Sequence, residues 1–152
     1  MRITIYCIGK KHDPLYVSAI QDYSSRVERS VTLRWELLPP SGQNGSVARD
    51  EESEALLKRV VPTDIVWLLD ETGKIISSPE LSEQIAKVQQ TGQDIIIIIG
   101  GAFGVNQALK QRANFIWSLS KLVFPHQLVR VLVAEQLYRS YEILRGSGYH
   151  HV

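Results

Sequence analysis

Five consecutive isoleucines, Ile95–Ile99, constrain the fold of this 152-residue chain more than any other segment. A strand with one face in water alternates apolar and polar residues, whereas this run has no polar position. An uninterrupted β-branched run is typical of a central strand in a parallel sheet, where helices cover both faces. We therefore expect residues 94–99 to form a buried strand in the middle of a parallel sheet.

The segments on either side of this run alternate between strand and helix patterns. Apolar periodicity predicts further strands at residues 3–8, 33–38, 64–69 and 115–119, and helices at 14–28, 49–60, 78–90, 106–113 and 125–145. Ser78 is the expected cap of the third helix, with Pro79 at its first position, and Glu71 to Lys74 is an expected turn. This alternation defines an α/β fold with a largely parallel sheet. No repeat or linker divides the chain, so we expect one domain over residues 1–152.

The composition is that of an ordinary globular protein, with 44% hydrophobic and 22% charged residues. A single cysteine, Cys7, excludes an internal disulfide and a cysteine-cluster metal site. The first residues form a short strand-like run without the long apolar core of an export signal. No stretch approaches the roughly 20 apolar residues of a membrane span. We therefore expect a cytoplasmic protein with no membrane partner.

Charge is distributed unevenly around a net value of +1, which argues against an indiscriminate nucleic-acid binder. From Leu109 onward there are six basic residues and two acidic ones, Glu135 and Glu142. This local excess permits an anionic partner at the C-terminal end without demanding one. The acidic run Asp50 to Glu54 is best explained by an acidic helix start that favours the helix dipole.

Three loops follow the last three predicted strands, at the sheet edge where parallel α/β folds bind ligands. The first begins at Leu69, the second spans 100–104 and the third spans 118–125. The glycines of the second loop allow the backbone to approach a ligand closely, although they fit neither the dinucleotide nor the phosphate-loop pattern. The third loop is apolar and suits the wall of an adenine pocket, and ordinary core packing explains it as well.

Several motifs of the last third, taken together, are far more specific than any one of them. They are Ile99–Gly104, Ser118–Ser120, Phe124–Arg130, Glu135–Arg139 and the terminal Tyr149-His150 pair. In these motifs, and along its whole length, the chain closely resembles the RlmH family of the SPOUT superfamily of methyltransferases. The resemblance implies a methyl transfer from S-adenosylmethionine (SAM) to N3 of a pseudouridine in 23S rRNA of the assembled ribosome, performed by a homodimer.

The resemblance also implies a fold feature and a donor site that periodicity does not reveal. SPOUT domains thread their C-terminal segment through a trefoil knot, here within about residues 65–152, whereas topology rules alone disfavour knots. Carried over by position, the SAM-binding residues are Leu69, Gly100, Leu119, Ser120, Lys121, Leu122, Val123 and Phe124. These residues fall in the three loops selected above.

The chemistry of this transfer needs alignment and removal of a proton from the attacking imide nitrogen. The sulfonium already activates the methyl group, so no metal is expected, and the four histidines include no pair at metal-ligand spacing. An imide proton is weakly acidic, so a nearby cation that stabilises the anion can replace a strong base.

Six residues are the candidates for these roles: His126, Arg130, Glu135, Arg139, Tyr149 and His150. His126 and Arg130 lie one helical turn apart, as do Glu135 and Arg139, although spacing alone favours an ordinary solvated ion pair for the latter. His126 is also consistent with a simple helix cap, and His150 with a disordered tail. The base stays open among His126, His150 and Glu135.

The end of the chain supports two further expectations. Apolar residues occupy more than one stripe of the helix at 125–145, so we expect a second subunit to cover the side that the sheet does not. Gly146 and Gly148 disfavour helix, so we expect the tail to turn there. Tyr149 and His150 then reach over the donor pocket, where Tyr149 can stack on a base.

Two other hypotheses compete with that of a SAM-dependent methyltransferase. A non-catalytic ribosome-binding or assembly factor on the same fold would have no need of SAM. A nucleotide-binding enzyme with a flavodoxin-like sheet would need a phosphate-cradling motif after the first strand, and Gly9 to His12 is too short to supply it.

Overall fold

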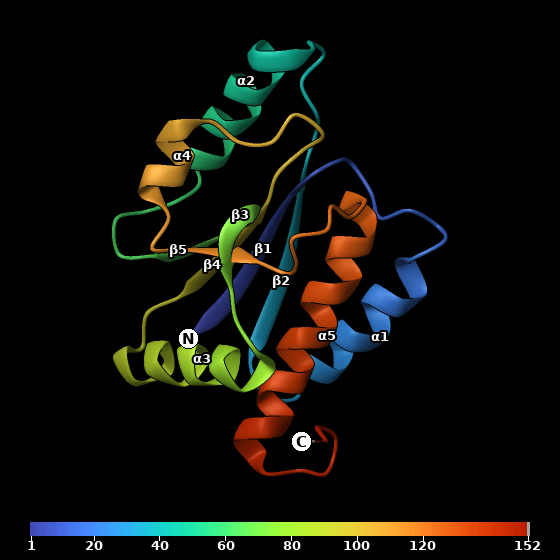
Figure 1. Ribbon diagram of the computed structural model, residues 1–152, viewed down its shortest axis with the longest axis vertical. Coiled ribbons are helices and arrows are strands. Elements are labelled where there is room, and N and C mark those ends of the chain that lie inside the picture. The colour runs from blue at the N-terminus through green and yellow to red at the C-terminus, as the bar shows by residue number, and fades with distance from the viewer. Residues whose placement is uncertain (152) are drawn as a thin grey trace.

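The computed structural model describes residues 1–151, which form a five-stranded sheet with helices on both faces (Figure 1). In chain order the elements are β1 (Arg2–Ile8), α1 (Val17–Val27), β2 (Thr32–Leu38), α2 (Gly45–Leu57), β3 (Ile65–Ile75), α3 (Ser78–Thr91), β4 (Ile95–Ile99), α4 (Gln107–Arg112), β5 (Phe115–Ser118) and α5 (His126–Arg145). The strand order is β2-β1-β4-β3-β5, and every neighbouring pair is parallel. The predicted α/β class is confirmed.

The isoleucine run is the centre of the sheet. Strand β4 pairs with β1 on one side and β3 on the other, so that Ile97 lies opposite both Ile5 and Trp67. All five isoleucines are buried, the most exposed at 5%. Side chains on both faces of the strand are covered, which explains why the sequence shows no alternation.

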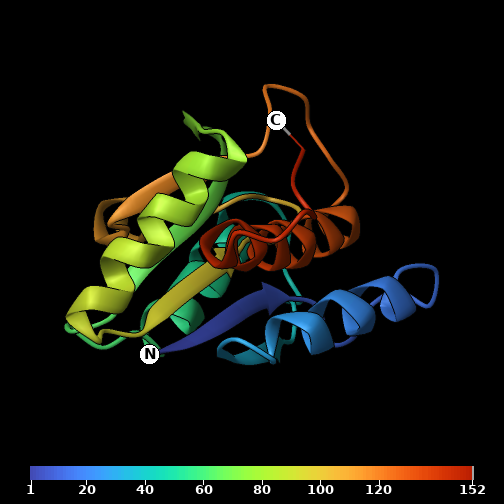
Figure 2. The ribbon, with the colours of Figure 1, turned by 90° about the horizontal axis from the view of Figure 1, so that it is seen from below.

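The helices form two layers, one on each face of the sheet. Helix α5 contacts α1 and α3 on one face, and α2 contacts α4 on the other. Figure 2 shows α5 lying between α1 and α3. The apolar core is accordingly split in two: Ile5 and Leu137 belong to the part under α5, and Leu68 and Leu109 to the part under α2 and α4.

Strand β3 is longer than expected, because the predicted turn at Glu71 to Lys74 is an interruption within it. The β3–β5 register shifts between Leu69 and Lys74, and pairing resumes at Lys74 and Ile75. A Cβ on Gly73 would lie 2.6 Å from the Ile116 carbonyl oxygen, so glycine lets the two strands stay close here. The expectation of a strand that ends at Leu69 is therefore wrong.

The N-cap of α3 lies one residue before the expected position, so Pro79 is the second helical residue and not the first. Ser77, and not Ser78, is the N-cap, and its hydroxyl accepts a hydrogen bond from the Glu80 backbone N–H. The Glu80 carboxylate in turn accepts from the Ser77 N–H at 2.7 Å, which completes a capping box.

Helix α1 also differs at its start. It begins at Val17, because the Asp13 carboxylate accepts from the Leu15 N–H and holds residues 13–16 in a turn.

Helix α2 begins at Gly45, before the expected start at Arg49, and has no acidic residue in its first turn. The acidic run Asp50 to Glu54 lies in the middle of the helix, so its interpretation as an acidic helix start is wrong. Glu52 within this run is buried, with 6% of its surface exposed.

Candidate active site

A cavity of about 300 Å³ opens at the carboxyl ends of β4 and β5, beside the interruption in the middle of β3. Seven of the eight residues expected to bind SAM line it: Leu69, Gly100, Leu119, Ser120, Leu122, Val123 and Phe124. Lys121 does not line it, whereas Trp117 and Val129, which the sequence analysis did not select, add to its apolar wall. We call this cavity the donor pocket.

Local contacts shape the two loops that enclose the donor pocket. At the end of β4, a Cβ on Gly100 would lie 2.9 Å from Val105 Cγ1, so a larger residue would displace the loop. After β5, the Ser118 hydroxyl donates to the Ser120 carbonyl oxygen at 2.8 Å, and Leu122 N–H donates to the Ser120 hydroxyl at 3.0 Å. These bonds hold the apolar loop in the conformation that encloses the pocket.

The polar rim of the donor pocket carries Asp70. Burial raises the pKa of this carboxyl, but hydrogen bonds from Thr72 and the charge of Lys110 outweigh it, so that its pKa is lowered. Thr72 donates to Oδ1 through its N–H and its hydroxyl, and Lys110 Nζ lies 3.6 Å from Oδ2. Asp70 is therefore an ionised group whose two oxygens already have partners.

His126, at the first turn of α5, lies in the donor-pocket wall and also borders a second cavity. Burial lowers the pKa of His126 and the positive charge of Arg130 lowers it further, while Glu52 opposes them. These influences favour a neutral imidazole at pH 7, which is the form able to accept a proton.

Arg130, one turn further along, has a different environment. It is 1% exposed, and its guanidinium donates to the carbonyl oxygens of Ile8 and Lys11, each at 3.1 Å. Nη1 also lies 3.2 Å from Nδ1 of His12, whose ring packs edge-on against Trp35. Arg130 thus ties the loop after β1 to α5, a role that its helical spacing from His126 does not reveal.

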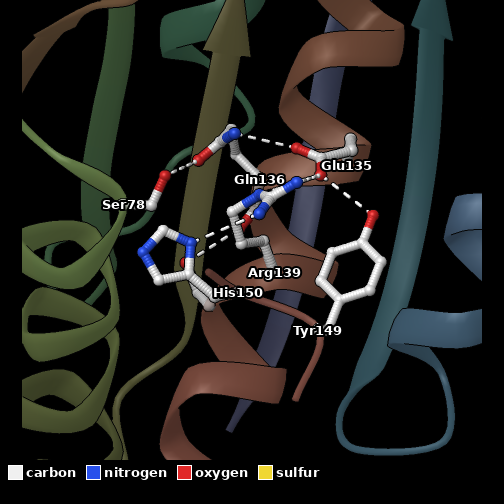
Figure 3. A network of polar contacts seen from close by, with 7 residues as sticks. Ser78, Glu135, Gln136, Arg139, Tyr149 and His150 are labelled. Atoms are coloured by element: carbon white, nitrogen blue, oxygen red, sulfur yellow. Dashed lines mark hydrogen bonds and ion pairs between the residues drawn. The ribbon is translucent and has the colours of Figure 1, made fainter. Parts of the chain in front are cut away.

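The other four candidate residues form a network on the distal half of α5 (Figure 3). Glu135 Oε1 accepts from Arg139 Nη2 at 2.6 Å, from Nε at 2.9 Å and from the Tyr149 hydroxyl at 3.1 Å. Arg139 Nη1 lies 3.2 Å from Nδ1 of His150, and its guanidinium carbon lies 4.7 Å from the Tyr149 ring centre. The solvated ion pair expected from spacing alone is therefore part of a larger assembly, which we call the tail cluster.

Neighbouring groups extend the tail cluster and bias its protonation. Gln136 donates to Glu135 Oε2 at 2.8 Å and accepts from the Ser78 hydroxyl at 2.6 Å, which links the cluster to α3. Burial and the hydrogen bond to Glu135 raise the pKa of Tyr149 to about 12. The hydrogen bonds to Glu135 raise the pKa of Arg139.

The tail leaves α5 at Gly146, where the two glycines predicted a turn. Gly146 caps α5 in the left-handed conformation with φ of 73°, which returns the chain along the helix. The ring of Tyr149 then packs edge-on against that of Tyr138, with ring centres 4.6 Å apart. Tyr149 and His150 are thus ordered against α5.

The donor pocket and the tail cluster lie apart within one chain. None of Glu135, Arg139, Tyr149 and His150 lines the donor pocket. His126 and Arg139 are 13 positions apart on α5, a helical rise of about 20 Å. The six candidate residues are therefore brought together as two groups.

The sequence analysis missed Glu52 and Gln136. Glu52 was assigned to an acidic helix start, and only its burial distinguishes it from the neighbouring acids. Gln136 had no signal of its own, because its contact with Ser78 joins two distant segments.

Comparison with known proteins establishes the family of this chain. The chain belongs to the SPOUT methyltransferase family, since a family model described as a predicted SPOUT methyltransferase matches residues 1–150. Relatives named "Ribosomal RNA large subunit methyltransferase H" are 37% identical in Thioalkalivibrio sulfidiphilus and 38% identical in Pelobacter propionicus. Each alignment covers 99% of this chain, and 99% and 100% of the respective relative. The resemblance stated from the motifs is confirmed.

A solved structure supports the fold. A probable methylase family protein from Haemophilus influenzae Rd KW20 superimposes with a TM-score of 0.57 at 14% identity, over 99% of this chain and 70% of that one. In residues 1–151, no helix has the length and apolar character needed to cross a membrane.

Proposed function

We propose that this protein transfers a methyl group from SAM to N3 of a pseudouridine in 23S rRNA of the assembled ribosome. The observation that carries the proposal is the donor pocket, where seven of the positions carried over from the family resemblance meet around one cavity. The relatives' name, ribosomal RNA large subunit methyltransferase, supports the substrate class. The resemblance to the RlmH family supports the pseudouridine and its N3 atom.

The donor pocket has the composition that a methyl donor of this kind needs. Trp117, Leu119 and Phe124 offer apolar surface for an adenine ring, and Gly100 leaves room for close approach of the backbone. When bound, SAM supplies a methyl group already activated by its sulfonium. The task of the protein is then to align this group with the acceptor and to handle one proton, and we propose no metal.

We further propose that the protein acts as a homodimer packed through α5. Leu128, Val131 and Leu132 remain only half-buried on this helix. In the preceding loop Leu122 is 69% and Val123 77% exposed. An apolar surface of this kind, directly beside a binding cavity, is typical of an interface. Sedimentation is expected to give a dimer at micromolar concentration, and a well-folded monomer would reject this part of the proposal.

A twofold axis across α5 would also reunite the two groups of candidate residues. Twofold packing makes the same helix face contact itself in reverse, so the distal half of one α5 approaches the proximal half of the other. The tail cluster of one subunit then lies near the donor pocket of the other, as the expected reach of Tyr149 and His150 requires. In such a site the Arg139 guanidinium can stabilise the imide anion, and the base remains open among His126, His150 and Glu135.

We place the reaction in the cytoplasm, where assembled ribosomes are found. We propose that residues 1–152 act as one SPOUT domain whose C-terminal part, from about residue 65, carries the knot and the donor site.

Mass spectrometry of 23S rRNA from a strain that lacks the gene tests the reaction. We expect the loss of one methyl group from a pseudouridine and its return on complementation, and purified protein should restore it on ribosomes when SAM is added. An unchanged rRNA methylation pattern, together with no calorimetric binding of SAM, would instead favour a non-catalytic ribosome-binding or assembly factor.

A further inference from the structure

A second cavity, of about 320 Å³, lies beside the donor pocket. Ile8, the last residue of β1, and Ser41, which follows β2, line it together with Glu52 of α2 and the start of α5. Gly101, Ala102 and His126 line both cavities. A ligand in the donor pocket therefore has the second cavity next to it.

The second cavity contains a buried acceptor without a partner. Glu52 Oε2 accepts from the Ser41 N–H at 2.9 Å, whereas Oε1 is buried and has no hydrogen-bond partner in residues 1–151. A Cβ on Gly101 would lie 2.6 Å from Oε1, so glycine leaves the space in which this oxygen lies. Buried carboxylate oxygens are almost always hydrogen-bonded, so Oε1 points to a donor that binds from outside the chain.

The same cavity contains a buried donor without a partner. Arg130 donates through Nη1 and Nη2 to the carbonyls of Lys11 and Ile8, but its Nε is buried and unpaired within the described residues. Glu52 and Arg130 both line the cavity. Two residues of its lining therefore carry one anionic acceptor and one cationic donor that have no partner within residues 1–151.

We infer that the second cavity holds the α-amino acid end of SAM, with its ammonium on Glu52 Oε1 and its carboxylate toward Arg130 Nε. This inference rests on the proposed function. An α-amino acid presents one ammonium and one carboxylate, which is the complement of what the cavity offers, and hydrogen bonds between charged groups are the strong ones. A uracil-type base carries N–H donors for Glu52 but no anion for Arg130.

Other carboxylates near the donor pocket are less suited to the ammonium. Both oxygens of Asp70 are already engaged by Thr72 and Lys110. Glu71 lines the donor pocket but is exposed, so water competes for it. Glu52 is buried, and its Oε1 has no partner within residues 1–151.

Two nucleoside ligands separate the amino-acid end from the rest of the donor. S-adenosylhomocysteine keeps this end, and 5′-methylthioadenosine lacks it. Calorimetry is expected to show that Glu52→Gln lowers the affinity for S-adenosylhomocysteine at least tenfold, which is about 1.4 kcal/mol. The affinity for methylthioadenosine should change by less than about twofold. The ratio of the two affinities cancels any partial loss of folded protein. Glu51→Gln, an exposed neighbour that bonds the Ser41 hydroxyl, is the matched control and should leave the ratio unchanged.

The outcomes decide between specific alternatives. If the ratio of the two affinities is unchanged in Glu52→Gln, because neither affinity falls or both fall equally, the inference is overturned. The proposed function still stands in that case, provided that the wild-type protein binds the donor. A changed ratio in Glu71→Gln alone places the amino-acid end in the donor pocket and also overturns it. Wild-type protein that binds neither ligand contradicts the proposed function itself. If Glu52→Gln fails to fold, Glu52→Asp, which withdraws the carboxylate, is expected to shift the ratio in the same direction.

Discussion

The two halves of α5 carry pairs that look alike in sequence and differ in the structure. His126 with Arg130, and Glu135 with Arg139, are each spaced by four residues and include an arginine. Arg130 is enclosed and bonded to backbone carbonyls from the start of the chain, whereas Arg139 lies in a side-chain network with the tail. The same spacing thus gives one arginine held mainly by backbone carbonyls and one held by side chains of the tail cluster.

The largest expected effect concerns Arg130. Arg130→Met keeps the volume but leaves the Ile8 and Lys11 carbonyls without donors, so we expect a loss of about 2–4 kcal/mol of unfolding free energy. Urea denaturation measures this loss. Arg139→Met should cost less than about 1 kcal/mol, because its partners are partly solvated. Equal losses in the two variants would end the distinction between the arginines.

A substitution in the donor pocket, which borders the first half of α5, tests whether this region binds the ligand. Gly100→Val places a branched side chain against Val105, in a wall of the pocket, and is expected to weaken SAM binding by about a hundredfold, or roughly 2.7 kcal/mol. Calorimetry and circular dichroism report affinity and fold. Gly42→Ala, where an added Cβ meets nothing within 4 Å, is the control. If the folded Gly100→Val protein binds SAM with undiminished affinity, SAM does not bind in this cavity.

Truncation tests the distal half. Removal of residues 148–152 deletes Tyr149 and His150 but little of the core, so we expect a small change in stability and unaltered SAM binding. Methyl transfer to ribosomes should fall at least tenfold, which corresponds to about 1.4 kcal/mol of transition-state stabilisation. If the truncated protein methylates ribosomes at the full rate, Tyr149 and His150 do not belong to the active site.

The smallest expected effect is a dependence of stability on pH through His12. Burial lowers the pKa of His12 and the Arg130 charge lowers it further, so the folded protein binds a proton less readily than the unfolded chain, whose histidine titrates near 6.5. Stability from this group is present above about pH 6.5 and is lost as the pH falls through the lower folded value. His12→Gln, which keeps an acceptor for Arg130, should therefore reduce the fall in melting temperature between pH 7 and pH 5. Substitution of the exposed His151 by Gln should leave the fall in melting temperature unchanged. An equal fall in the two variants would contradict a role for His12.

The sequence by itself determined the sheet and the donor pocket. An all-isoleucine strand must be covered on both faces, and the carboxyl ends of parallel strands meet at one edge, so the loops that follow Ile99 and Ser118 had to lie beside each other. These inferences use local pattern and a topological rule, and both act over short stretches of chain.

Only the tertiary structure decided which polar groups are buried and what they meet. Arg130 bonds Ile8 across 122 positions, Glu52 borders the loop after β4, and the tail folds along α5 away from its own donor pocket. Helical spacing fixes which residues share a face, but the partner of that face comes from another element. Because burial of a charge depends on everything packed around it, no local pattern distinguishes Arg130 from Arg139 or Glu52 from Glu51.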